Sequence, residues 1–328
     1  MKKSTFYFVL FFAVTSIFSS FKNSEKQPDL PLSEFELLVQ YLENNGNFIN
    51  TVSPALVDAQ EIKENLKNEK YLVLDIRSAD WFDYGHIKKS QNLKAEELLT
   101  YLDNKINAAS YDKITIACYS GQSAAYYTSL LRFYGFNNVY SLKWGMSSWD
   151  QEFATNSWVK NAKDEFSDQL EKTTNAKPEK GVTPILSTGK MDAQEILKTR
   201  IKEAFTKPYK ESLVKSAIAI ENPQDYFIVN YTRNEVYSAG HIKGAIHYEP
   251  NKCLSSKTNL FTLPSDKKIV INCDTGLHAA YAVAYLKILG YDAYNMPYGS
   301  NSYMNSIMVE KNWNGWSKNE IKNFPVVE

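Results

Sequence analysis

Short apolar runs alternate with longer mixed stretches along most of this chain. Four short runs are dominated by apolar residues, as expected of strands buried on both faces: residues 71–74, 114–117, 226–229 and 269–271. Residues 123–134 and 278–289 follow two of these runs and are predicted to be helices, each closed by a glycine, Gly135 or Gly290. The alternation of strand and helix predicts an α/β fold in which helices flank both faces of a parallel sheet.

The same pattern occurs twice at a constant spacing. Residues 113–125 read Lys-Ile-Thr-Ile-Ala-Cys-Tyr-Ser-Gly-Gln-Ser-Ala-Ala, and residues 268–280 read Lys-Ile-Val-Ile-Asn-Cys-Asp-Thr-Gly-Leu-His-Ala-Ala. The Gly-His-Ile-Lys sequence at residues 85–88 recurs at residues 240–243 with the same offset of 155. A constant offset over this length indicates two copies of one domain.

The chain is therefore divided into five segments. They are a targeting segment at residues 1–20, a helical lead-in at 28–53, a first domain at 54–155, a linker at 156–188 and a second domain at 189–328. Lys, Glu, Thr and Asn dominate the linker, which is typical of a solvated connection. One repeated phrase has a different offset: Val57-Asp-Ala-Gln-Glu-Ile recurs as Met191-Asp-Ala-Gln-Glu-Ile. This phrase predicts about 21 extra residues in the second copy, within residues 198–222 and read as additional helix.

The N-terminus has the pattern of a signal peptide. Lys2 and Lys3 precede an apolar run from Phe6 to Phe18, which is short for a membrane span. The sequence therefore predicts export, with the periplasm as the expected compartment and an uncleaved N-terminal membrane anchor as the alternative.

Overall charge argues against nucleic acid as a partner. The 328 residues include 37 basic and 37 acidic side chains, 44% apolar residues and 23% charged residues. Nucleic-acid binding normally requires a basic surface. No Cys or His pair has the spacing of a zinc site, so neither a metal nor a cofactor is predicted.

Cys118 and Cys273 occupy equivalent positions, where an apolar strand ends and a helix begins. Active sites of parallel α/β folds lie at this edge. The unpaired N–H groups and dipole of the following helix are expected to lower the thiol pKa, and the thiolate is the reactive form. Gly121 and Gly276 would allow the tight turn that this loop requires. The third cysteine, Cys253, has no equivalent and is interpreted as a plain thiol.

With these residues in place, the chain resembles the rhodanese family of sulfurtransferases in tandem form. The resemblance rests on Asp75-Ile-Arg77, Gly85-His86-Ile, the Cys118 loop and Gly145-x-x-x-Trp149. It implies that Cys118 takes sulfur as a persulfide from a small donor of the thiosulfate, mercaptopyruvate or polysulfide type. The sulfur then passes to a thiol, another thiophilic acceptor or a protein acceptor. It further implies that the substrate is held by a loop of five residues, the substrate cradle: Tyr119, Ser120, Gly121, Gln122 and Ser123. Asp75, Arg77 and His86 would support this loop. Cys273 is implied as a second candidate nucleophile.

The loops themselves exclude one related chemistry. Phosphatases of this type carry Cys-x5-Arg, but the residues six positions after the two cysteines are Ala124 and Ala279. Neither loop contains Lys or Arg, which also weakens the case for tight binding of thiosulfate. A small or neutral donor would be equally compatible.

The second copy departs from the first. Asn230 and Thr232 replace the Asp75 and Arg77 pair, and Asp274 follows the second cysteine. A carboxylate there would raise the thiol pKa and repel anionic donors, unless His278 pairs with it. The second copy is therefore interpreted as partly degenerate. Two alternatives to an enzyme remain open: a non-catalytic binding or sulfur-carrier module, and a thiol redox protein that depends on an external thiol.

Overall fold

The computed structural model describes residue 1 and residues 32–328. The predicted signal peptide and the first residues of the predicted lead-in lie outside the described residues. Within the described part, no helix is both long and apolar enough to cross a membrane.

The first domain is built on a sheet of five parallel strands in the order β1-β5-β4-β2-β3. Its strands are β1 (Leu56–Val57), β2 (Tyr71–Asp75), β3 (Gln91–Asn92), β4 (Lys113–Ala117) and β5 (Val139–Leu142). The central strands β2 and β4 are the apolar runs that precede Asp75 and Cys118. Both residues therefore stand at the carboxyl edge of the sheet.

The second domain repeats this plan with four parallel strands in the order β7-β6-β8-β9. They are β6 (Phe227–Asn230), β7 (Ile246–His247), β8 (Ile269–Asn272) and β9 (Ala293–Asn295). A single parallel bridge from Leu213 to Asn295 takes the place of a fifth strand. The predicted fold class, α/β with two parallel sheets, is confirmed.

Thirteen α-helices connect these strands within the described residues. The first eight are α1 (Glu34–Asn44), α2 (Phe48–Thr51), α3 (Ala59–Glu64), α4 (Ala79–Tyr84), α5 (Leu98–Asn104), α6 (Gln122–Tyr134), α7 (Gln151–Thr155) and α8 (Trp158–Asn161). The remaining five are α9 (Ala193–Phe205), α10 (Ser216–Glu221), α11 (Asn234–Ala239), α12 (Leu277–Ile288) and α13 (Asn305–Glu310). Helices α6 and α12 match the two helices predicted after the cysteines to within one residue at each end.

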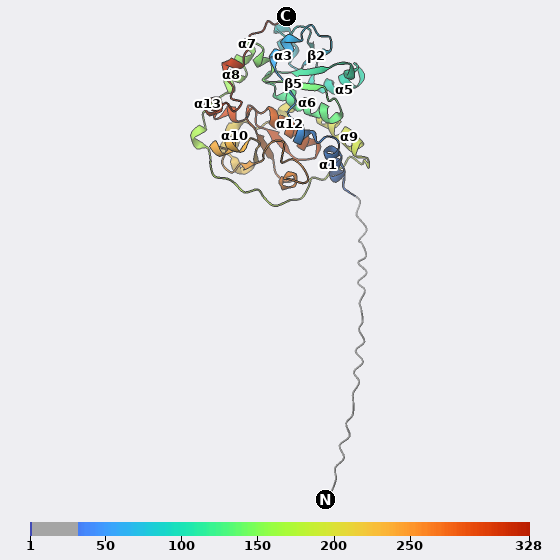
Figure 1. Cartoon of the computed structure of the whole chain (residues 1–328), viewed down its shortest axis with the longest axis vertical. Coiled ribbons are helices and arrows are strands. Elements are labelled where there is room, and N and C mark those ends of the chain that lie inside the picture. The colour runs from blue at the N-terminus through green and yellow to red at the C-terminus, as the bar shows by residue number, and fades with distance from the viewer. Residues whose placement is uncertain (2–31) are drawn as a thin grey trace. The chain divides into compact units, whose positions relative to one another are not determined.

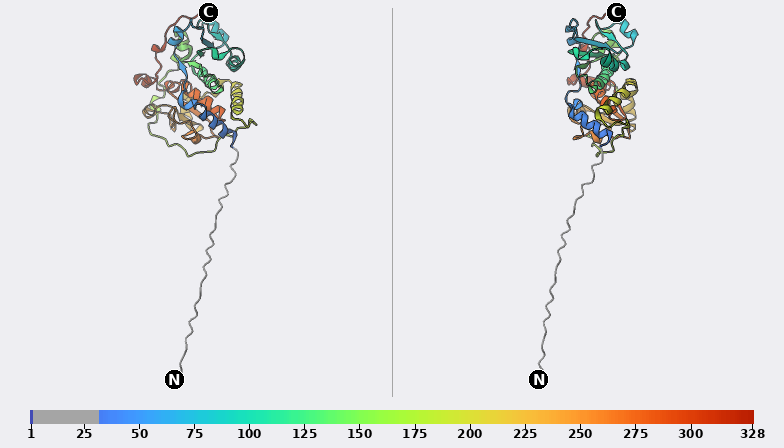
Figure 2. Two further views of the ribbon diagram at one scale, coloured as in Figure 1. Left: turned by 45° about the vertical axis from the view of Figure 1, so that its right-hand side comes forward. Right: turned by 90° about the vertical axis from the view of Figure 1, so that its right-hand side faces the viewer.

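The two domains share one hydrophobic core. Successive side chains of a strand point to opposite faces, so Leu72 and Leu74 of β2 enter the shared core while Val73 enters a separate outer core. In β8, Ile269 and Ile271 join the same shared core from the other domain. Helices α6 and α12 lie together at the centre, between the two sheets (Figures 1 and 2).

Each domain is preceded by a helical segment that packs on the other domain. Helix α1 stands before the first domain, yet the Phe35 ring contacts the rings of Phe261 and Tyr291, with centroids 6.1 Å apart in both cases. Helix α9 stands before the second domain, yet its Phe205 ring lies 5.4 Å from that of Tyr127 in α6. The helical lead-in is thus present in both copies, in exchanged positions.

This exchange corrects the predicted insertion. Leu56 pairs with Ser141 in β5, and Leu213 makes the equivalent parallel bridge in the second copy. The counterpart of the segment beginning at Val57 therefore starts near Val214, and the phrase at Met191 belongs to the second lead-in. Residues 192–212 are the equivalent of residues 34–51 and are not an insertion. A short sequence such as Asp-Ala-Gln can recur by chance. It therefore aligns the two copies less reliably than the pairing of equivalent strands does.

The segments that follow each domain are exchanged as well. Residues 163–190 run along the second domain, where Lys163 N–H donates to Asn301 O at 2.9 Å and Glu171 pairs with His241. The C-terminal segment returns to the first domain, where Phe324 N–H donates to Trp149 O at 2.8 Å and Val327 pairs with His86. Residues 32–328 accordingly form a single unit.

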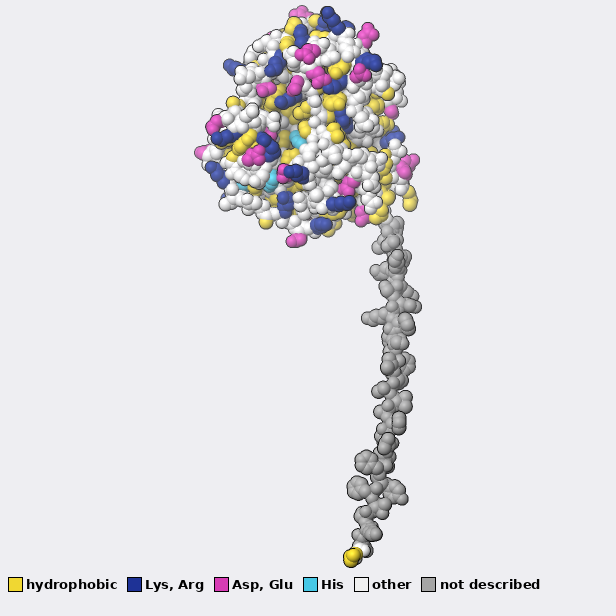
Figure 3. All heavy atoms as spheres, viewed as in Figure 1, with side chains coloured by type: hydrophobic (Ala, Val, Ile, Leu, Met, Phe, Trp, Pro, Cys, Tyr) yellow, Lys and Arg dark blue, Asp and Glu magenta, His cyan; other side chains and the backbone are white. Residues whose placement is uncertain are grey.

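Positive and negative side chains are interspersed over the face of the molecule drawn in Figure 3. That face carries no extended patch of one sign. This distribution agrees with the net charge of zero and gives no support to a nucleic-acid surface there.

Candidate active site

The Cys118 loop is a tight turn between β4 and α6. Gly121 caps α6 with a φ of 89°, in the left-handed region that favours glycine. A side chain at this position would lie 2.9 Å from the Leu142 carbonyl oxygen and 3.0 Å from the Gly145 nitrogen. Gly145 is under the same constraint, because a Cβ there would lie 2.4 Å from the Cys118 carbonyl oxygen. The two glycines allow the loop to close against the turn after β5.

The carbonyl groups of the loop are turned away from the sulfur and accept hydrogen bonds from residues on the other side of the loop. Met146 N–H donates to the Cys118 carbonyl at 2.8 Å, and the Ser147 hydroxyl donates to the Tyr119 carbonyl at 2.9 Å. The indole N–H of Trp158 donates to the Ser120 carbonyl at 2.9 Å. With its carbonyls fixed on one side, the loop can present N–H groups to the other.

Two backbone N–H groups point at the Cys118 sulfur. Gly121 N lies 3.2 Å and Ala124 N lies 3.4 Å from Sγ. The Gly121 amide belongs to the predicted cradle, whereas Ala124 lies one residue beyond it. Donors at these distances would stabilise negative charge on the sulfur or on an atom bonded to it.

The predicted lowering of the Cys118 pKa is wrong in its net direction. Burial raises the pKa of this thiol, because its side chain is only 1% exposed and desolvation disfavours the thiolate. Hydrogen bonds from the Ser123 hydroxyl and from the Ala124 and Gly121 amides lower the pKa, but they only partly offset burial. The sequence pattern correctly located the donors but contained no measure of how deeply the sulfur is enclosed.

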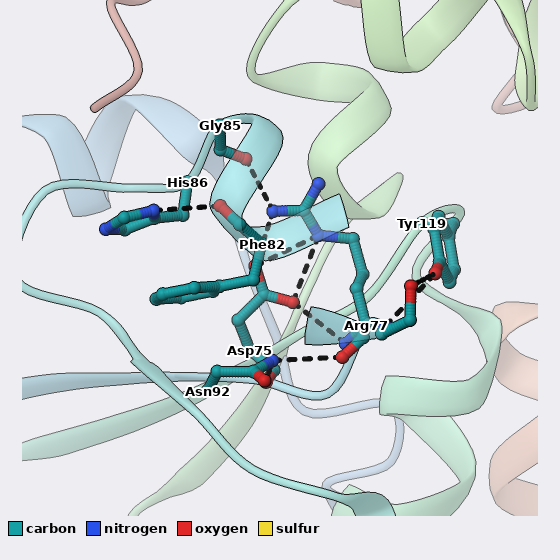
Figure 4. Close-up of polar contacts among 8 residues, drawn as sticks. Asp75, Arg77, Phe82, Gly85, His86, Asn92 and Tyr119 are labelled. Carbon is teal, nitrogen blue, oxygen red and sulfur yellow. Dashed lines mark hydrogen bonds and ion pairs between the residues drawn. The ribbon is translucent and has the colours of Figure 1, made fainter. Parts of the chain in front are cut away.

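Asp75 and Arg77 form a fully buried ion pair beside the loop (Figure 4). Arg77 Nη2 lies 2.7 Å from Asp75 Oδ2 and also donates to the Gly85 carbonyl at 2.7 Å. The Arg77 backbone N–H donates to Asp75 Oδ1 at 3.0 Å. The Asn92 amide ties the two backbone carbonyls together, donating to Asp75 O and Arg77 O at 2.9 Å each. The pair thus fixes the shape of the strand end.

Tyr119 links this strand end to the cysteine loop. Ser78 N–H donates to the Tyr119 hydroxyl at 3.1 Å. Figure 4 shows Tyr119 on the same side of Asp75 as Arg77. The Tyr119 ring also packs edge-on against Trp81, with centroids 6.0 Å apart. Its side chain remains 38% exposed, so it stands at the mouth of the site.

His86 has a structural position. Its Nδ1 lies 2.9 Å from the Phe82 carbonyl, and its ring stacks on Phe82 at 3.8 Å (Figure 4). His241 repeats this arrangement in the second domain, 2.8 Å from the Tyr237 carbonyl. Neither ring is among the residues lining the cavities beside the cysteines.

A cavity of about 630 Å³ opens above the first loop. The first domain contributes Tyr119 and Ser123 of the predicted cradle, together with Arg77 and Lys94. The exchanged lead-in of the second domain closes the other side with the residues Phe205, Thr206, Pro208, Tyr209 and Lys210. Lys94 and Lys210 supply the positive charge that the loop itself lacks. The position of Lys94 in a strand-end loop gave a weak signal, but nothing in the sequence placed Lys210 at the cavity over the Cys118 loop.

The other three cradle residues lie elsewhere. Ser120 and Gly121 form the turn beneath the cavity, and the Gln122 side chain points into the second loop. There its Oε1 accepts the Tyr298 N–H at 3.2 Å, and a Cβ at Gly276 would lie 3.3 Å from the Gln122 Cδ. Leu277 makes the reciprocal contact, 3.0 Å from a Cβ at Gly121. The two cysteine loops therefore pack directly on each other.

The second loop has the same backbone and different electrostatics. Gly276 N and Ala279 N lie 3.1 Å and 3.2 Å from the Cys273 sulfur. Burial, and then the negative charge of Asp274, raise the Cys273 pKa to about 11. Asp274 thus raises the pKa of the neighbouring thiol, as the sequence predicted. His278 does not offset it: burial lowers its pKa to about 3, so the ring is neutral.

All three cysteines are buried free thiols, and Cys253 lies in the shared core. Within residues 32–328 no three His, Cys, Asp or Glu side chains gather in a way that could hold a metal ion.

Both domains thus belong to the class of parallel α/β domains in which a buried strand ends at a cysteine, two backbone N–H groups point at its sulfur, and a helix follows. A family model described as the rhodanese-like domain matches residues 58–152 and 212–306, so the chain belongs to the rhodanese-like family and carries two copies of the domain.

Curated relatives include sulfurtransferases. The thiosulfate sulfurtransferase GlpE of Shewanella oneidensis is 35% identical over 80 residues, covering 24% of this chain and 75% of that protein. GlpE of Pseudoalteromonas translucida is 30% identical over 92 residues, covering 28% and 84%. A solved thiosulfate sulfurtransferase from Pseudomonas aeruginosa aligns with 83% of this chain and 68% of its own, at 13% identity and a TM-score of 0.28.

Proposed function

We propose that this protein is a sulfurtransferase that moves sulfane sulfur through a persulfide on Cys118. The observation that carries the proposal is the pair of N–H donors from Gly121 and Ala124 directed at the Cys118 sulfur. Such donors stabilise a thiolate before transfer and a terminal persulfide anion after it. The similarity to proteins named thiosulfate sulfurtransferase supports the same chemistry.

The reaction would proceed in two balanced steps. The Cys118 thiolate attacks the sulfane sulfur of a donor such as thiosulfate, a new S–S bond forms, and the donor's S–S bond breaks so that sulfite leaves with the electron pair. An acceptor thiolate then attacks the outer sulfur of the persulfide. The acceptor leaves as a persulfide, and the Cys118 thiolate is restored.

An anionic donor is the best match for the first cavity. Lys94 and Lys210 stand on opposite sides of it, and Glu96 is the only carboxylate among the described residues that line it. This distribution reverses the expectation drawn from the loops alone, because the cations come from outside them. The Tyr119 and Ser123 hydroxyls add hydrogen-bond donors at the same mouth.

The direct test is mass spectrometry of the intact, reduced protein after brief exposure to thiosulfate, with the modified peptide mapped. We expect one added sulfur atom on Cys118 and none on Cys273. Absence of added sulfur on Cys118 in folded, reduced protein would contradict the proposal.

A carrier without turnover is a second candidate, favoured by the near-complete burial of the Cys118 sulfur. Loading of one sulfur without repeated transfer to cyanide or a thiol would select the carrier. Sustained turnover would select the enzyme.

Removing both cavity lysines should weaken donor binding more than it slows the chemistry. In the Lys94→Ala/Lys210→Ala variant we expect KM for thiosulfate to rise about five- to tenfold while kcat changes less than about twofold, because exposed charges attract an anion without touching the reacting sulfur. Steady-state kinetics at fixed ionic strength would measure this. Lys207→Ala is the matched control, since Lys207 belongs to the same segment but lines a different cavity.

Reactivity of Cys118 should rise steeply with pH. Burial raises the pKa of this thiol, so the thiolate is a minor species at neutral pH and its fraction grows as pH approaches the pKa from below. We expect the alkylation rate by iodoacetamide, mapped to Cys118, to increase about tenfold per pH unit between about pH 7 and about pH 8.5. A rate that is flat over this range would indicate a thiolate already formed at neutral pH.

We further propose that the protein is exported, on the strength of the charged and apolar pattern of residues 1–20. Fractionation of cells expressing the full chain would test this: recovery in the cytoplasm with the N-terminus intact would contradict it.

A further inference from the structure

A second cavity, of about 560 Å³, lies over the Cys273 loop and is the counterpart of the first. Its second-domain wall uses the positions equivalent to those of the first cavity: residues 231–233 correspond to 76–78, residues 249–251 to 94–96, and residues 274 and 278 to 119 and 123. Its opposite wall comes from the first domain, with Pro54, Leu56, Asp58 and Lys143. The volume is in the range of cavities that hold small molecules.

Two equivalent positions become more acidic in the second cavity, whereas Arg233 in place of Ser78 and Asn251 in place of Glu96 change the charge in the opposite sense. Glu249 stands where the first cavity has Lys94, and Asp274 stands where it has Tyr119. With Asp58 from the first domain, three carboxylates border this cavity. The two cations of its lining are Lys143 and Arg233, and Arg233 pairs with Glu235 at 2.9 Å. The lining of the second cavity thus has more carboxylates than cations, whereas that of the first has more cations than carboxylates, so an anionic donor is less favoured here than in the first cavity.

Two polar atoms at this cavity lack partners. Asp274 Oδ2 accepts a hydrogen bond from Asn314 Nδ2 at 3.0 Å, but the buried Oδ1 has no partner within the described residues. The buried Nε2 of His278 is likewise without one in the part of the chain that the structure describes. A buried polar atom without a hydrogen bond carries a free-energy cost, which a ligand can relieve by supplying the missing donor.

The remaining surface of the cavity is suited to an apolar group. Leu56, Leu277 and the Tyr231 ring line it, and the Tyr231 ring packs edge-on against His278 with centroids 4.9 Å apart. Cys273 lies among them, 2% exposed. The chemistry that fits is an apolar body with a cationic N–H donor at one end.

We propose that the cavity over the Cys273 loop is a separate binding site for a small organic cation, in which the Asp274 carboxylate receives an ammonium or amidinium N–H. This site is independent of sulfur transfer at Cys118. The second copy then retains the architecture of the first with its ligand preference inverted.

Isothermal titration calorimetry of the full chain with benzylammonium at about pH 7.5 tests the proposal. We expect saturable binding of one equivalent, and a loss in affinity of at least about tenfold in Asp274→Asn, which removes the charge at constant shape. Glu96→Gln, a matched loss of charge in the first cavity, should change the affinity less than about twofold. Benzoate and benzyl alcohol, of similar shape but without the cation, should bind at least about tenfold more weakly.

Alkylation of the cysteines locates the probe. Saturating benzylammonium should slow alkylation of Cys273 several-fold and leave that of Cys118 unchanged. The proposal is overturned if benzylammonium does not saturate, if Asp274→Asn binds it equally well, if benzoate competes equally, or if Cys273 is not protected. Cys118→Ser should bind benzylammonium normally. The binding result therefore does not depend on sulfur transfer, and failure of either proposal can be distinguished from failure of the other.

Discussion

Replacing Cys118 with serine is expected to abolish sulfur transfer while leaving the fold intact. Serine is close to cysteine in shape, and its hydroxyl can accept the N–H groups of Gly121 and Ala124 that now reach the sulfur. It cannot form a persulfide, so the covalent route is lost. We expect the rate of thiosulfate-dependent transfer to fall about 10³-fold or more, with an unchanged circular dichroism spectrum.

Two matched variants make this result specific. Cys273→Ser removes the thiol with the same backbone environment, and Cys253→Ser removes the buried thiol of the shared core. Both should retain most of the activity if they fold. A Cys118→Ser protein that keeps more than a tenth of the wild-type rate would show that another group carries the sulfur.

Breaking the buried ion pair should produce the largest loss of stability. In Arg77→Met, Asp75 keeps its position with a side chain 1% exposed, but it loses the guanidinium 2.7 Å away. An uncompensated buried charge costs about 3–5 kcal/mol in the free energy of unfolding. Denaturant titration should reveal this loss, and the thermal midpoint should fall by about 6–20 °C at the scaling of larger domains.

The second domain supplies the compensating change. At the equivalent positions a neutral pair is present, in which the Thr232 hydroxyl donates to the Asn230 side chain. Copying it into the first domain as Asp75→Asn/Arg77→Thr should recover a large part of the stability lost in Arg77→Met. Lys70→Met, which removes the exposed partner of Asp112 at 3.8 Å, should cost less than about 0.5 kcal/mol. A double variant as unstable as Arg77→Met would mean that packing of the Arg77 side chain matters more than charge.

The periodicity of the sequence was sufficient to predict the central strands β2, β4, β6 and β8, helices α6 and α12, and the position of both cysteines. These elements depend on local patterns: an apolar run, a glycine in the turn and a glycine after the helix. Gly121 and Gly290 have the positive φ values that such positions favour. The wrong insertion arose where two short sequence words were compared without strand register, which only the pairing of Leu56 and Leu213 provides.

The site was predictable only in its first-domain half. Tyr119 and Ser123 follow Cys118 directly, so proximity in sequence ensures proximity in space. Tyr209 and Lys210 come from a segment about ninety residues away that crosses between domains, and no local pattern reports such a crossing. The pKa of Cys118 was mispredicted for the same reason, because burial is produced by distant segments whereas N–H donors are produced by the local turn.

Because each lead-in segment packs on the other domain, the second copy cannot be deleted without removing part of the first domain's cavity. The segment from Phe205 to Lys210, which precedes the second domain, forms the opposite wall of the first domain's cavity. Residues Pro54 to Asp58 of the first domain contribute in the same way to the wall of the second cavity. Expressing the two halves separately, divided within residues 156–188, would therefore give two fragments. Each fragment would carry the segment that closes the other domain's cavity and would lack the segment that closes its own. The second copy could change every reactive group in its loop and still be required, because among the described residues only its segment from Phe205 to Lys210 closes that side of the first cavity.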